Sequence, residues 1–338
     1  MRLLITDLNT EINKGLEKNS AGDNVTLDVF KNVDDVTEES WNKANAIITY
    51  RGSKTIMKYL SKLKNTKIIV RGGVGFDGLD LKKLGNKGIA VCTVPDYGTT
   101  EVADHAMALM LMMRRGLDQY DNLMRKDANK YWRYIEAPCV DRIRNKTFGI
   151  FGLGRIGNAT AKRAVAFDMN VVFYDPLLPD GSELSYGYKR VHTPEKLFEL
   201  SDTISIHCPL NNITEGMINK SLFSIAKNSL LLINTARGGI INLDDLYDAL
   251  KDEKIMGAAL DVLPIEPPDL SHPIFHSYMK NENWIKGRFT ISPHAAYYSP
   301  PGLEDLRSKA VRTAVEYIKN NNLRNCQNLD YLKWTIFH

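Results

Sequence analysis

The amino-acid sequence predicts an α/β protein built from two doubly wound parallel sheets. Short apolar runs alternate with helical stretches over the first third of the chain, and the same alternation resumes after residue 147. Between them, a glycine pattern at residues 152–157 joins an apolar strand to a helix, as dinucleotide-binding units do. Because about 140 residues precede this pattern, we expect a cofactor domain and a second α/β domain that binds substrate.

The first third of the chain contains five apolar runs with the length of buried strands. They are Leu3–Thr6, Leu27–Phe30, Ala46–Thr49, Lys67–Arg71 and Ile89–Cys92. Helical stretches such as Ser53–Leu63 and Asp80–Asn86 lie between them. This alternation favours a parallel α/β sheet.

The strand and helix pattern continues through the rest of the chain. An apolar run from Ala106 to Met113, with acids before it and Arg114–Arg115 after it, predicts a buried helix. Pro194–Leu200 and Leu243–Lys251, the latter capped by Asn242, are predicted helices. Strands are predicted at Val171–Tyr174, Thr203–His207, Leu230–Asn234, Gly257–Asp261 and Phe289–Ser292. Two doubly wound domains therefore account for the chain.

Each glycine of the mid-chain pattern has a physical role in binding a dinucleotide. Gly152 allows a tight turn, Gly154 lets backbone N–H groups approach a pyrophosphate, and Gly157 lets the helix pack closely on the strand. The helix N-terminus offers unpaired donors to the phosphates. Asp175 follows Gly157 by 18 positions, at the end of the next strand. Its carboxylate can accept the ribose hydroxyls and would repel a 2′-phosphate, so NAD is favoured over NADP. The alternative is that the glycines only end a strand.

Composition and charge exclude several classes of protein. The chain has 338 residues, of which 43% are hydrophobic and 25% charged, and a formal net charge of +4 with scattered basic residues. A nucleic-acid partner is therefore not expected. The first strand is too short for a signal peptide, and the longest apolar run is far below the ~20 residues that span a bilayer. Four cysteines without metal-type spacing favour reduced thiols, no metal site and a cytoplasmic location.

Polar residues at the carboxyl ends of the later strands are the first candidates for a ligand site, because ligands of such sheets bind there. Arg237 follows one strand within Asn-Thr-Ala-Arg-Gly-Gly, Glu266 follows the next within Asp-Val-Leu-Pro-Ile-Glu-Pro, and His294 follows the last within Ser-Pro-His-Ala-Ala. Taken alone, each has an ordinary alternative as a turn, a loop or a structural histidine.

These motifs, in this order, resemble those of the D-isomer-specific 2-hydroxyacid dehydrogenases. The similarity covers roughly residues 66–315 and includes the glycine unit and Gly-Ala-Ala-Leu-Asp-Val. Val-Arg-Gly-Gly-Val-Gly-Phe-Asp at residues 70–77 and Val-Phe-Tyr-Asp-Pro at 172–176 are closest to the branch that includes the C-terminal-binding protein corepressors. The resemblance implies a Rossmann-type NAD domain inserted into a flavodoxin-like substrate domain.

The resemblance also implies a catalytic set and a reaction. In the reduction of a 2-oxo acid with NADH, His294 would be the general acid and Glu266 would bind its other ring nitrogen. Arg237 would bind the substrate carboxylate and the developing oxyanion. In the oxidation direction His294 would be the base.

The remaining site residues are implied by the same resemblance. The cofactor set comprises Gly152, Gly154, Arg155, Ile156, Gly157, Asp175, His207, Pro209, Thr235 and Asp261. The substrate set comprises Arg71, Gly73, Val74, Gly75 and Tyr297, the last standing where the corepressors have a tryptophan. Two alternatives stay open: His207 is a strand-end histidine, and Asp261 caps a turn rather than holding the nicotinamide amide.

The family layout predicts the domain limits. Residues 1–100 and 304–338 would form the substrate-binding domain, and residues 101–303 the NAD domain, with hinges at the Thr99–Arg114 helix and near Pro300. Family members are usually homodimers, and Tyr131–Tyr134 is a candidate interface or lid, or alternatively an aromatic anchor under a loop. The long stretch between Glu266 and His294 is expected to form an extra loop near the mouth of the site.

A second hypothesis is an NAD-sensing interaction protein of the corepressor type. The first 66 residues show no recognisable signature of a peptide-binding cleft, so the enzyme is preferred. Neither the particular 2-hydroxy acid nor the physiological direction can be read from the sequence.

Overall fold

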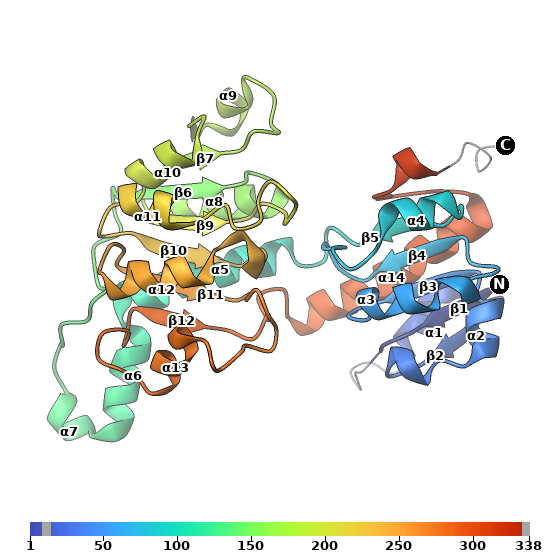
Figure 1. Ribbon diagram of the computed structural model, residues 1–338, viewed down its shortest axis with the longest axis horizontal. Helices are drawn as coiled ribbons and strands as arrows, with labels where there is room; N and C mark the ends of the chain where they lie inside the picture. Colours follow the sequence, from blue (N-terminus) through green and yellow to red (C-terminus); the bar gives the residue numbers. More distant parts are fainter. Residues whose placement is uncertain (9–14, 333–338) are drawn as a thin grey trace. The chain divides into compact units, whose positions relative to one another are not determined.

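The computed structural model describes residues 1–8 and 15–332, which form two compact units (Figure 1). Unit 1 comprises residues 1–98 and 298–332, and unit 2 comprises residues 99–297. The domain limits expected at 100/101 and 303/304 lie two and six residues from these limits. Residues 333–338 of the expected first domain lie outside the described residues. Unit 2 is one continuous stretch, inserted between the two segments of unit 1.

Unit 1 contains a five-stranded sheet in which every pairing between strands is parallel. The order is β2-β1-β3-β4-β5, which is the order of flavodoxin-like doubly wound folds. The strands are β1 (Arg2–Ile5), β2 (Thr26–Val29), β3 (Ala46–Thr49), β4 (Ile68–Arg71) and β5 (Ala90–Thr93). Each of the five predicted strands is confirmed to within one residue at either end.

The strands of unit 1 contribute side chains to two separate cores, one on each face of the sheet, because successive side chains of a strand point to opposite faces. Leu3 and Ile5 belong to the core that α14 covers, whereas Leu4 packs with Trp41 on the other face. The α-helices are α1 (Leu16–Ala21), α2 (Glu38–Lys43), α3 (Ser53–Ile56), α4 (Leu81–Asn86) and α14 (Pro300–Asn320). The 3₁₀ helices are η1 (Val33–Asp35), η2 (Met57–Lys62) and η4 (Leu329–Tyr331).

The predicted helix at Ser53–Leu63 is only partly correct. An α-helix forms over its first four residues, and the chain then continues as the 3₁₀ helix η2. Three residues per turn bring Met57, Leu60 and Leu63 to one face, and all three pack against the core that contains Trp41. The spacing of these apolar residues matches the three residues per turn of η2.

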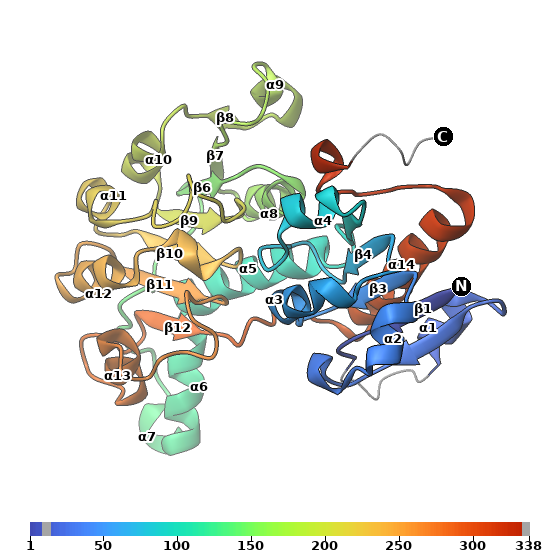
Figure 2. The same cartoon turned by 45° about the vertical axis from the view of Figure 1, so that its right-hand side comes forward.

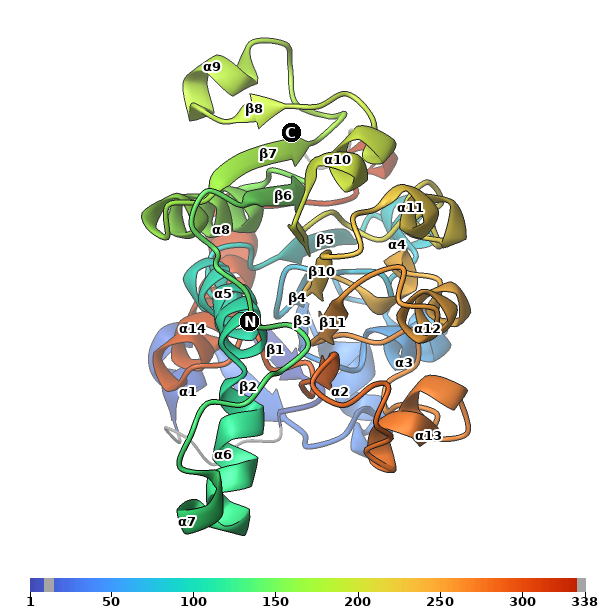
Figure 3. The ribbon, with the colours of Figure 1, turned by 90° about the vertical axis from the view of Figure 1, so that its left-hand side faces the viewer.

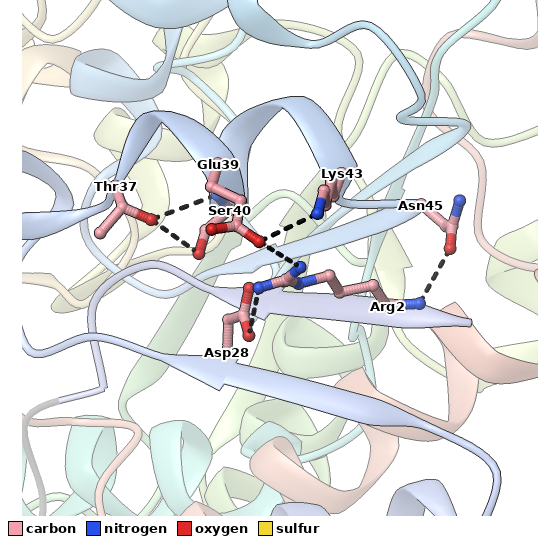
Figure 4. A network of polar contacts seen from close by, with 7 residues as sticks. All are labelled: Arg2, Asp28, Thr37, Glu39, Ser40, Lys43 and Asn45. Atoms are coloured by element: carbon pink, nitrogen blue, oxygen red, sulfur yellow. Dashed lines mark hydrogen bonds and ion pairs between the residues drawn. The ribbon is translucent and has the colours of Figure 1, made fainter.

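A polar network joins the edge strand β2 to its neighbours (Figure 4). Arg2 of β1 donates from Nε to Asp28 at 2.7 Å and from Nη1 to Glu39 of α2 at 3.4 Å. Lys43 pairs with the same Glu39 oxygen at 3.0 Å. These charges lie beside an edge whose unpaired backbone groups would otherwise invite another strand.

Unit 2 contains a seven-stranded parallel sheet in the order β12-β11-β10-β9-β6-β7-β8. Figure 2 shows β9, β10, β11 and β12 stacked in this order down the sheet. The strands are β6 (Thr147–Phe151), β7 (Asn170–Tyr174), β8 (Lys189–Arg190), β9 (Thr203–Ile206), β10 (Leu231–Asn234), β11 (Gly257–Leu260) and β12 (Phe289–Ile291). The sequence did not predict β8, which has two basic residues and no apolar run. The other strands match their predictions to within one residue.

Helices cover both faces of this sheet (Figure 3). One core contains residues of α5 and α8, and the other contains residues of α10, α11, α12 and α13. The helices are α5 (Thr99–Arg115), α6 (Leu117–Lys126), α7 (Ala128–Tyr131), α8 (Arg155–Ala166), α9 (Ser182–Tyr186), α10 (Pro194–Leu200), α11 (Lys220–Ile225), η3 (Gly238–Ile240), α12 (Leu243–Lys251) and α13 (Pro273–Met279). The predicted helices at Pro194 and Leu243 are confirmed, with Thr193 and Asn242 as their N-caps.

The sheet of unit 2 has a topological switch point at β6 and β9. From β6 the chain moves to β7 and β8 on one side, and then returns to β9 and continues on the other side. Connections leave these two strands in opposite directions, which opens a crevice at their carboxyl ends where doubly wound sheets bind ligands. The glycine turn after β6 lies at this point.

Candidate functional site

The turn between β6 and α8 has the close contacts that its glycines predict. Gly152 has φ 94°, and a Cβ there would lie 2.8 Å from the backbone N of Cys208. A Cβ on Gly157 would lie 2.1 Å from the carbonyl oxygen of Gly152. Both positions therefore exclude a side chain, the first in the turn and the second where the helix meets the strand.

The start of α8 has the features of a phosphate cradle. Gly154 is the N-cap residue and supplies no side-chain cap. A Cβ on Gly154 would meet nothing within 4 Å, so the space beside this residue is open. Arg155 is exposed and Ile156 half-buried in the first turn of this helix. Backbone N–H groups without a side-chain cap, next to open space, fit a pyrophosphate.

Asp175 braces the glycine turn from the end of β7. One carboxylate oxygen accepts from the backbone N of Leu153 at 2.9 Å, and the other accepts from the backbone N of Leu177 at 2.9 Å. Each carboxylate oxygen can accept more than one hydrogen bond. The contacts hold the carboxylate beside the turn and leave it able to accept ribose hydroxyls.

The ends of β9 and β10 carry three further candidates. His207 bonds through Nε2 to Ser205 Oγ at 2.9 Å, which is the contact expected of a strand-end histidine. Burial of the ring lowers the pKa of His207 to about 3, so the imidazole is neutral at neutral pH. Pro209 is exposed in the loop that follows. Thr235 Oγ1 is buried and has no hydrogen-bond partner among the described residues, an orphaned hydroxyl that fits a bound ligand.

His294 and Glu266 form a direct pair at the ends of β12 and β11. His294 Nδ1 lies 2.7 Å from Glu266 Oε2, and the other oxygen, Oε1, accepts from the backbone N of Leu263 at 3.0 Å. The two side chains are 42% and 39% exposed, so the pair is open to a ligand. The Tyr297 ring stands edge-on to the imidazole, with centroids 6.3 Å apart.

Partial burial favours the protonated form of Glu266. Hydrogen bonds from His294 and Leu263, together with the charges of His294 and Arg237, outweigh that effect and lower the pKa of the carboxyl below its usual value. Glu266 is therefore ionised at neutral pH and presents a negative charge to the imidazole.

A glycine sets the distance between the Arg237 turn and the Glu266 loop. A Cβ on Gly238 would lie 1.9 Å from the carbonyl carbon of Leu263 and 2.3 Å from its oxygen, so the two backbones pass in direct contact. Asn234, fully buried at the end of β10, holds the same turn by accepting from Ala236 N and donating to Arg237 O, both at 2.9 Å. These contacts fix the turn that carries Arg237, whose positive charge acts on Glu266.

Asp261 anchors the loop that carries His294. Its carboxylate is 1% exposed and accepts from the backbone N of Ala295 and Ala296 at 2.9 Å and from Ser292 Oγ at 2.6 Å. Its carbonyl accepts from the backbone N of His294 at 2.8 Å. His294 has φ 52°, a conformation that non-glycine residues adopt only when their surroundings hold them there. These contacts cap the turn. They are compatible with a further contact from the carboxylate to the nicotinamide amide, because a carboxylate oxygen can accept more than one hydrogen bond.

Sequence reasoning missed His105, which lies behind this loop on α5. Its Nε2 is 2.9 Å from Ser292 Oγ and 3.6 Å from Asp261 Oδ1. The Ala-Asp-His-Ala sequence around His105 indicates only a buried helix. No local sequence pattern predicts that position 105 contacts position 292. Asn234 was also missed as a residue that holds the Arg237 turn. An asparagine at the end of a buried strand does suggest side-chain hydrogen bonds to the backbone of the following turn.

The expected substrate residues Arg71, Gly73, Val74 and Gly75 lie in unit 1, after β4. The Arg71 guanidinium donates back to the carbonyl of Gly72, and Gly73, with φ 144°, leaves no room for a Cβ beside it. Val74 is 37% exposed. The turn therefore presents backbone and one aliphatic side chain at the carboxyl edge of its sheet.

A second loop of unit 1 is organised by Asp7, another residue that sequence reasoning missed. Its carboxylate accepts from the backbone N of Tyr50 at 2.9 Å and of Gly52 at 2.7 Å, and also from that of Arg51. One acid at the end of β1 thus fixes the whole 50–52 loop at the carboxyl edge of this sheet.

Two expectations about loops need correction. The stretch between Glu266 and His294 is not an extra loop: it contains α13, and Ile274 and Phe275 are buried in the core of unit 2. The aromatic anchor considered for Tyr131–Tyr134 is also wrong, because Trp132 is 82% and Tyr134 85% exposed. Exposed rings leave the interface or lid as the remaining explanation of that segment.

In residues 1–8 and 15–332, none of the helices is long and apolar enough to cross a membrane. The same residues contain no group of three or more His, Cys, Asp or Glu side chains placed to hold a metal ion.

Comparison with protein families gives a match to one model. Residues 107–296 match the model described as D-isomer specific 2-hydroxyacid dehydrogenase, NAD binding domain. The matched range contains every cofactor candidate as well as Arg237, Glu266 and His294.

Three similar proteins are informative. A D-3-phosphoglycerate dehydrogenase of Archaeoglobus fulgidus is 34% identical over 85% of this chain and 52% of its own length. C-terminal-binding protein 1 of Caenorhabditis elegans is 31% identical over 87% of this chain and 40% of its own length. The chain thus spans about half the length of these curated relatives, or less. A crystal structure of D-lactate dehydrogenase from Aquifex aeolicus, complexed with NAD and lactic acid, is 28% identical, with a TM-score of 0.78 over 98% of this chain and 97% of that one.

Proposed function

The chain belongs to the D-isomer-specific 2-hydroxyacid dehydrogenase family, and from this premise we propose that it is an NAD-dependent oxidoreductase that interconverts 2-oxo acids and D-2-hydroxy acids. Unit 2 carries the NAD(P)-binding domain of that family. The observation that best supports the proposal is the 2.7 Å contact between His294 and Glu266, beside Arg237 and within the matched domain.

His294 is the proposed general acid. Because Nδ1 is engaged by Glu266, Nε2 is the nitrogen that gives its proton to the substrate oxygen during reduction. The contact with the Glu266 carboxylate fixes the orientation of the ring. Bound NADH supplies the hydride that reaches the keto carbon. In the reverse direction the neutral ring takes the proton from the hydroxyl group.

Arg237 is the proposed ligand of the substrate carboxylate and of the oxyanion. Its guanidinium can form two parallel hydrogen bonds to a carboxylate. In unit 1, Arg71 and the backbone N–H groups of residues 73–75 are proposed as substrate-binding groups. In unit 2, Tyr297 is proposed as a substrate-binding side chain. Arg155, Ile156, His207, Pro209, Thr235 and Asp261 are proposed to line the cofactor together with the glycine turn and Asp175.

Steady-state NADH consumption with a panel of 2-oxo acids tests the proposal. The panel comprises pyruvate, glyoxylate, hydroxypyruvate and aromatic and branched-chain analogues. We expect turnover of at least one, with the D-enantiomer of the product accepted in the reverse assay. Tight NADH binding without turnover of any of them would contradict the enzyme proposal.

That negative outcome would favour the second candidate, an NAD(H)-sensing interaction protein. The similarity of the chain to C-terminal-binding protein 1 is the observation that favours this second candidate. The two candidates share the catalytic residue types, so turnover, and not cofactor binding, separates them.

We further propose that the chain forms a homodimer through the segment Tyr131–Tyr134. Two exposed aromatic rings, Trp132 and Tyr134, are unusual on the surface of a monomer when they lie this close in sequence. Light scattering after size exclusion tests this, and a monomeric mass at micromolar concentration would refute it.

Asp175→Asn is expected to weaken the preference for NADH over NADPH. The substitution removes the charge that would repel a 2′-phosphate and keeps the size of the side chain. The ratio of kcat/KM for the two cofactors measures this preference. Asp180→Asn is the matched control, because Asp180 is fully exposed a few residues farther along. An unchanged ratio in Asp175→Asn would assign cofactor choice to another residue.

Gly238→Ala is expected to lower kcat/KM by about 10²-fold or more, because a displacement of ~1 Å in a catalytic group has that effect. The new methyl group would overlap the backbone of Leu263 and push Arg237 away from Glu266. Gly239→Ala is the matched control, since its Cβ would meet only the flexible end of Leu210, at 3.2 Å. Equal kinetics for the two variants, with native circular dichroism, would show that the backbone contact does not position Arg237.

A further inference from the structure

The C-terminal segment after α14 adds a short antiparallel pairing to the edge of the unit 1 sheet. Residues 325–327 lie alongside β5: the backbone N of Thr93 donates to Asn325 O at 3.2 Å, and the backbone N of Gln327 donates to Val91 O at 2.8 Å. These two bonds flank the bridge between Cys92 and Cys326. The two cysteines are therefore directly opposite each other as a non-hydrogen-bonded pair.

This register is the one in which two cysteines of adjacent strands can be joined. Residues in a non-hydrogen-bonded antiparallel pair have Cα atoms about 4.5 Å apart, and disulfides accept Cα separations of about 4.4–6.8 Å. Both thiols are free. A bond between the two sulfurs needs rotation of the side chains and no change of strand register.

The two thiols differ in access and in acidity. Cys92 is fully buried, whereas Cys326 is half-buried. Cys326 accepts a hydrogen bond from Cys92, which lowers the pKa of the Cys326 thiol and raises that of Cys92. Cys326 is thus the sulfur that a solute can reach and the one more readily present as a thiolate, which is the attacking form.

The segment is held in place by a buried side chain, and not by the cysteines alone. Asn328 is 1% exposed. Its amide oxygen accepts from Val91 N at 2.8 Å and from Cys326 Sγ at 3.2 Å, and its nitrogen donates to Ile89 O at 3.0 Å. The reduced protein therefore already holds Cys326 opposite Cys92 before any oxidation.

We propose that Cys92 and Cys326 are a redox modification site, at which a low-molecular-weight disulfide oxidises the pair to an intramolecular disulfide. The Cys326 thiolate attacks one sulfur of the oxidant, forms a mixed disulfide and releases one small thiolate. Cys92 then loses its proton to solvent and attacks Cys326 Sγ, releasing the second small thiol. Two protein thiols are oxidised to one disulfide, and the small disulfide is reduced to two thiols.

The disulfide fastens the C-terminal segment to β5 and closes a loop that contains the whole of unit 2. Cross-links that close long loops restrict the unfolded chain most. Oxidation therefore makes unit 1 harder to unfold. The proposal does not depend on which acid the protein acts upon.

Oxidised glutathione, added to the reduced full-length protein and followed by alkylation and peptide mass mapping, tests the site. We expect the free thiols to fall from four to two, a Cys92–Cys326 peptide without glutathione, and full reversal by dithiothreitol. A lasting glutathione adduct on Cys326 in the wild type, a disulfide between chains, or no change in thiol number would overturn the proposal.

Two variants separate the steps. Cys92→Ser is expected to accumulate the glutathione mixed disulfide on Cys326, because the second thiol is missing. Cys326→Ser is expected to leave Cys92 unmodified, because Cys92 is buried. Modification of Cys92 in that variant, or an unmodified Cys326 in Cys92→Ser, would contradict the proposed order of attack.

Thermal unfolding gives an independent measurement. The oxidised wild type is expected to unfold several degrees above the reduced wild type, whereas oxidant is expected to leave the midpoint of Cys326→Ser unchanged. Equal midpoints for oxidised and reduced wild type, with the disulfide present by mass, would show that the bond does not tie the segment to the sheet.

Discussion

Replacement of His294 by Gln is expected to lower kcat by about 10²–10⁴-fold, the usual contribution of a general acid. Glutamine can keep a hydrogen bond to Glu266 but cannot deliver a proton. The affinity for NADH, measured by fluorescence titration, is expected to stay near that of the wild type, because the glycine turn and Asp175 are untouched. The loss therefore falls on the chemical step.

His276→Gln is the matched control for this substitution, since His276 is exposed on α13 and outside the proposed site. Its kcat is expected to equal that of the wild type. If His294→Gln reduced 2-oxo acids at the wild-type rate, the proton would come from another group.

Glu266→Gln tests the partner of the same pair. Glutamine has one acceptor oxygen where the carboxylate has two, so the hold on the imidazole ring is expected to weaken and kcat/KM of the reductase reaction to fall. Steady-state kinetics measure this, and wild-type kcat/KM would show that the carboxylate of Glu266 is not needed to orient the ring.

The largest effect on stability is expected from Glu17→Ala. Arg307 of α14 is 1% exposed and Glu17 of α1 is 5% exposed. The guanidinium Nη2 lies 2.9 Å from Glu17 Oε2, and Nε donates to the other oxygen at 2.5 Å. Removing the carboxylate of such a pair takes away two charge-assisted hydrogen bonds to a buried guanidinium and costs about 3–5 kcal/mol. Urea unfolding, followed by circular dichroism, measures the free energy of unfolding.

Two further variants show whether the lost charge is responsible. The double variant Glu17→Leu with Arg307→Met replaces both charges by apolar groups and is expected to recover most of the loss. Lys43→Ala removes an exposed ion pair at the surface (Figure 4), and little change is expected. A Glu17→Ala protein as stable as the wild type would mean that water or another group compensates Arg307.

The strands of both sheets could be predicted from the sequence because parallel strands buried on both faces are continuous apolar runs. Leu3–Ile5 and Ile47–Ile48 illustrate this, since both cores receive residues from each run. Strand β8 could not be predicted: Lys189 and Arg190 pair with β7 at the sheet edge, where burial does not select apolar residues. Helix α13 was missed because it is only seven residues long and its N-cap is a histidine.

The site was predictable only as far as its motifs are local. The glycine turn and Asp175 lie within one strand-helix-strand unit, and the structure brings them together as expected. The pairing of Glu266 with His294 came from the family resemblance. Two further features of the site depend on tertiary packing between segments 25–35 residues apart. They are the hydrogen bonds of Asp261 to residues 294–296 and the close approach of Gly238 to Leu263. No local pattern encodes such contacts.

The insertion of unit 2 between two segments of unit 1 has a consequence for synthesis on the ribosome. One face of the unit 1 sheet is covered by Leu306, Val311 and other residues of α14, which are translated only after all of unit 2. Unit 2 is continuous in sequence and can complete its own core as it emerges. That face of the first five strands lacks the cover of α14 until this helix leaves the exit tunnel. The nascent chain therefore has a defined interval in which the apolar face of its first domain is the natural target of chaperones.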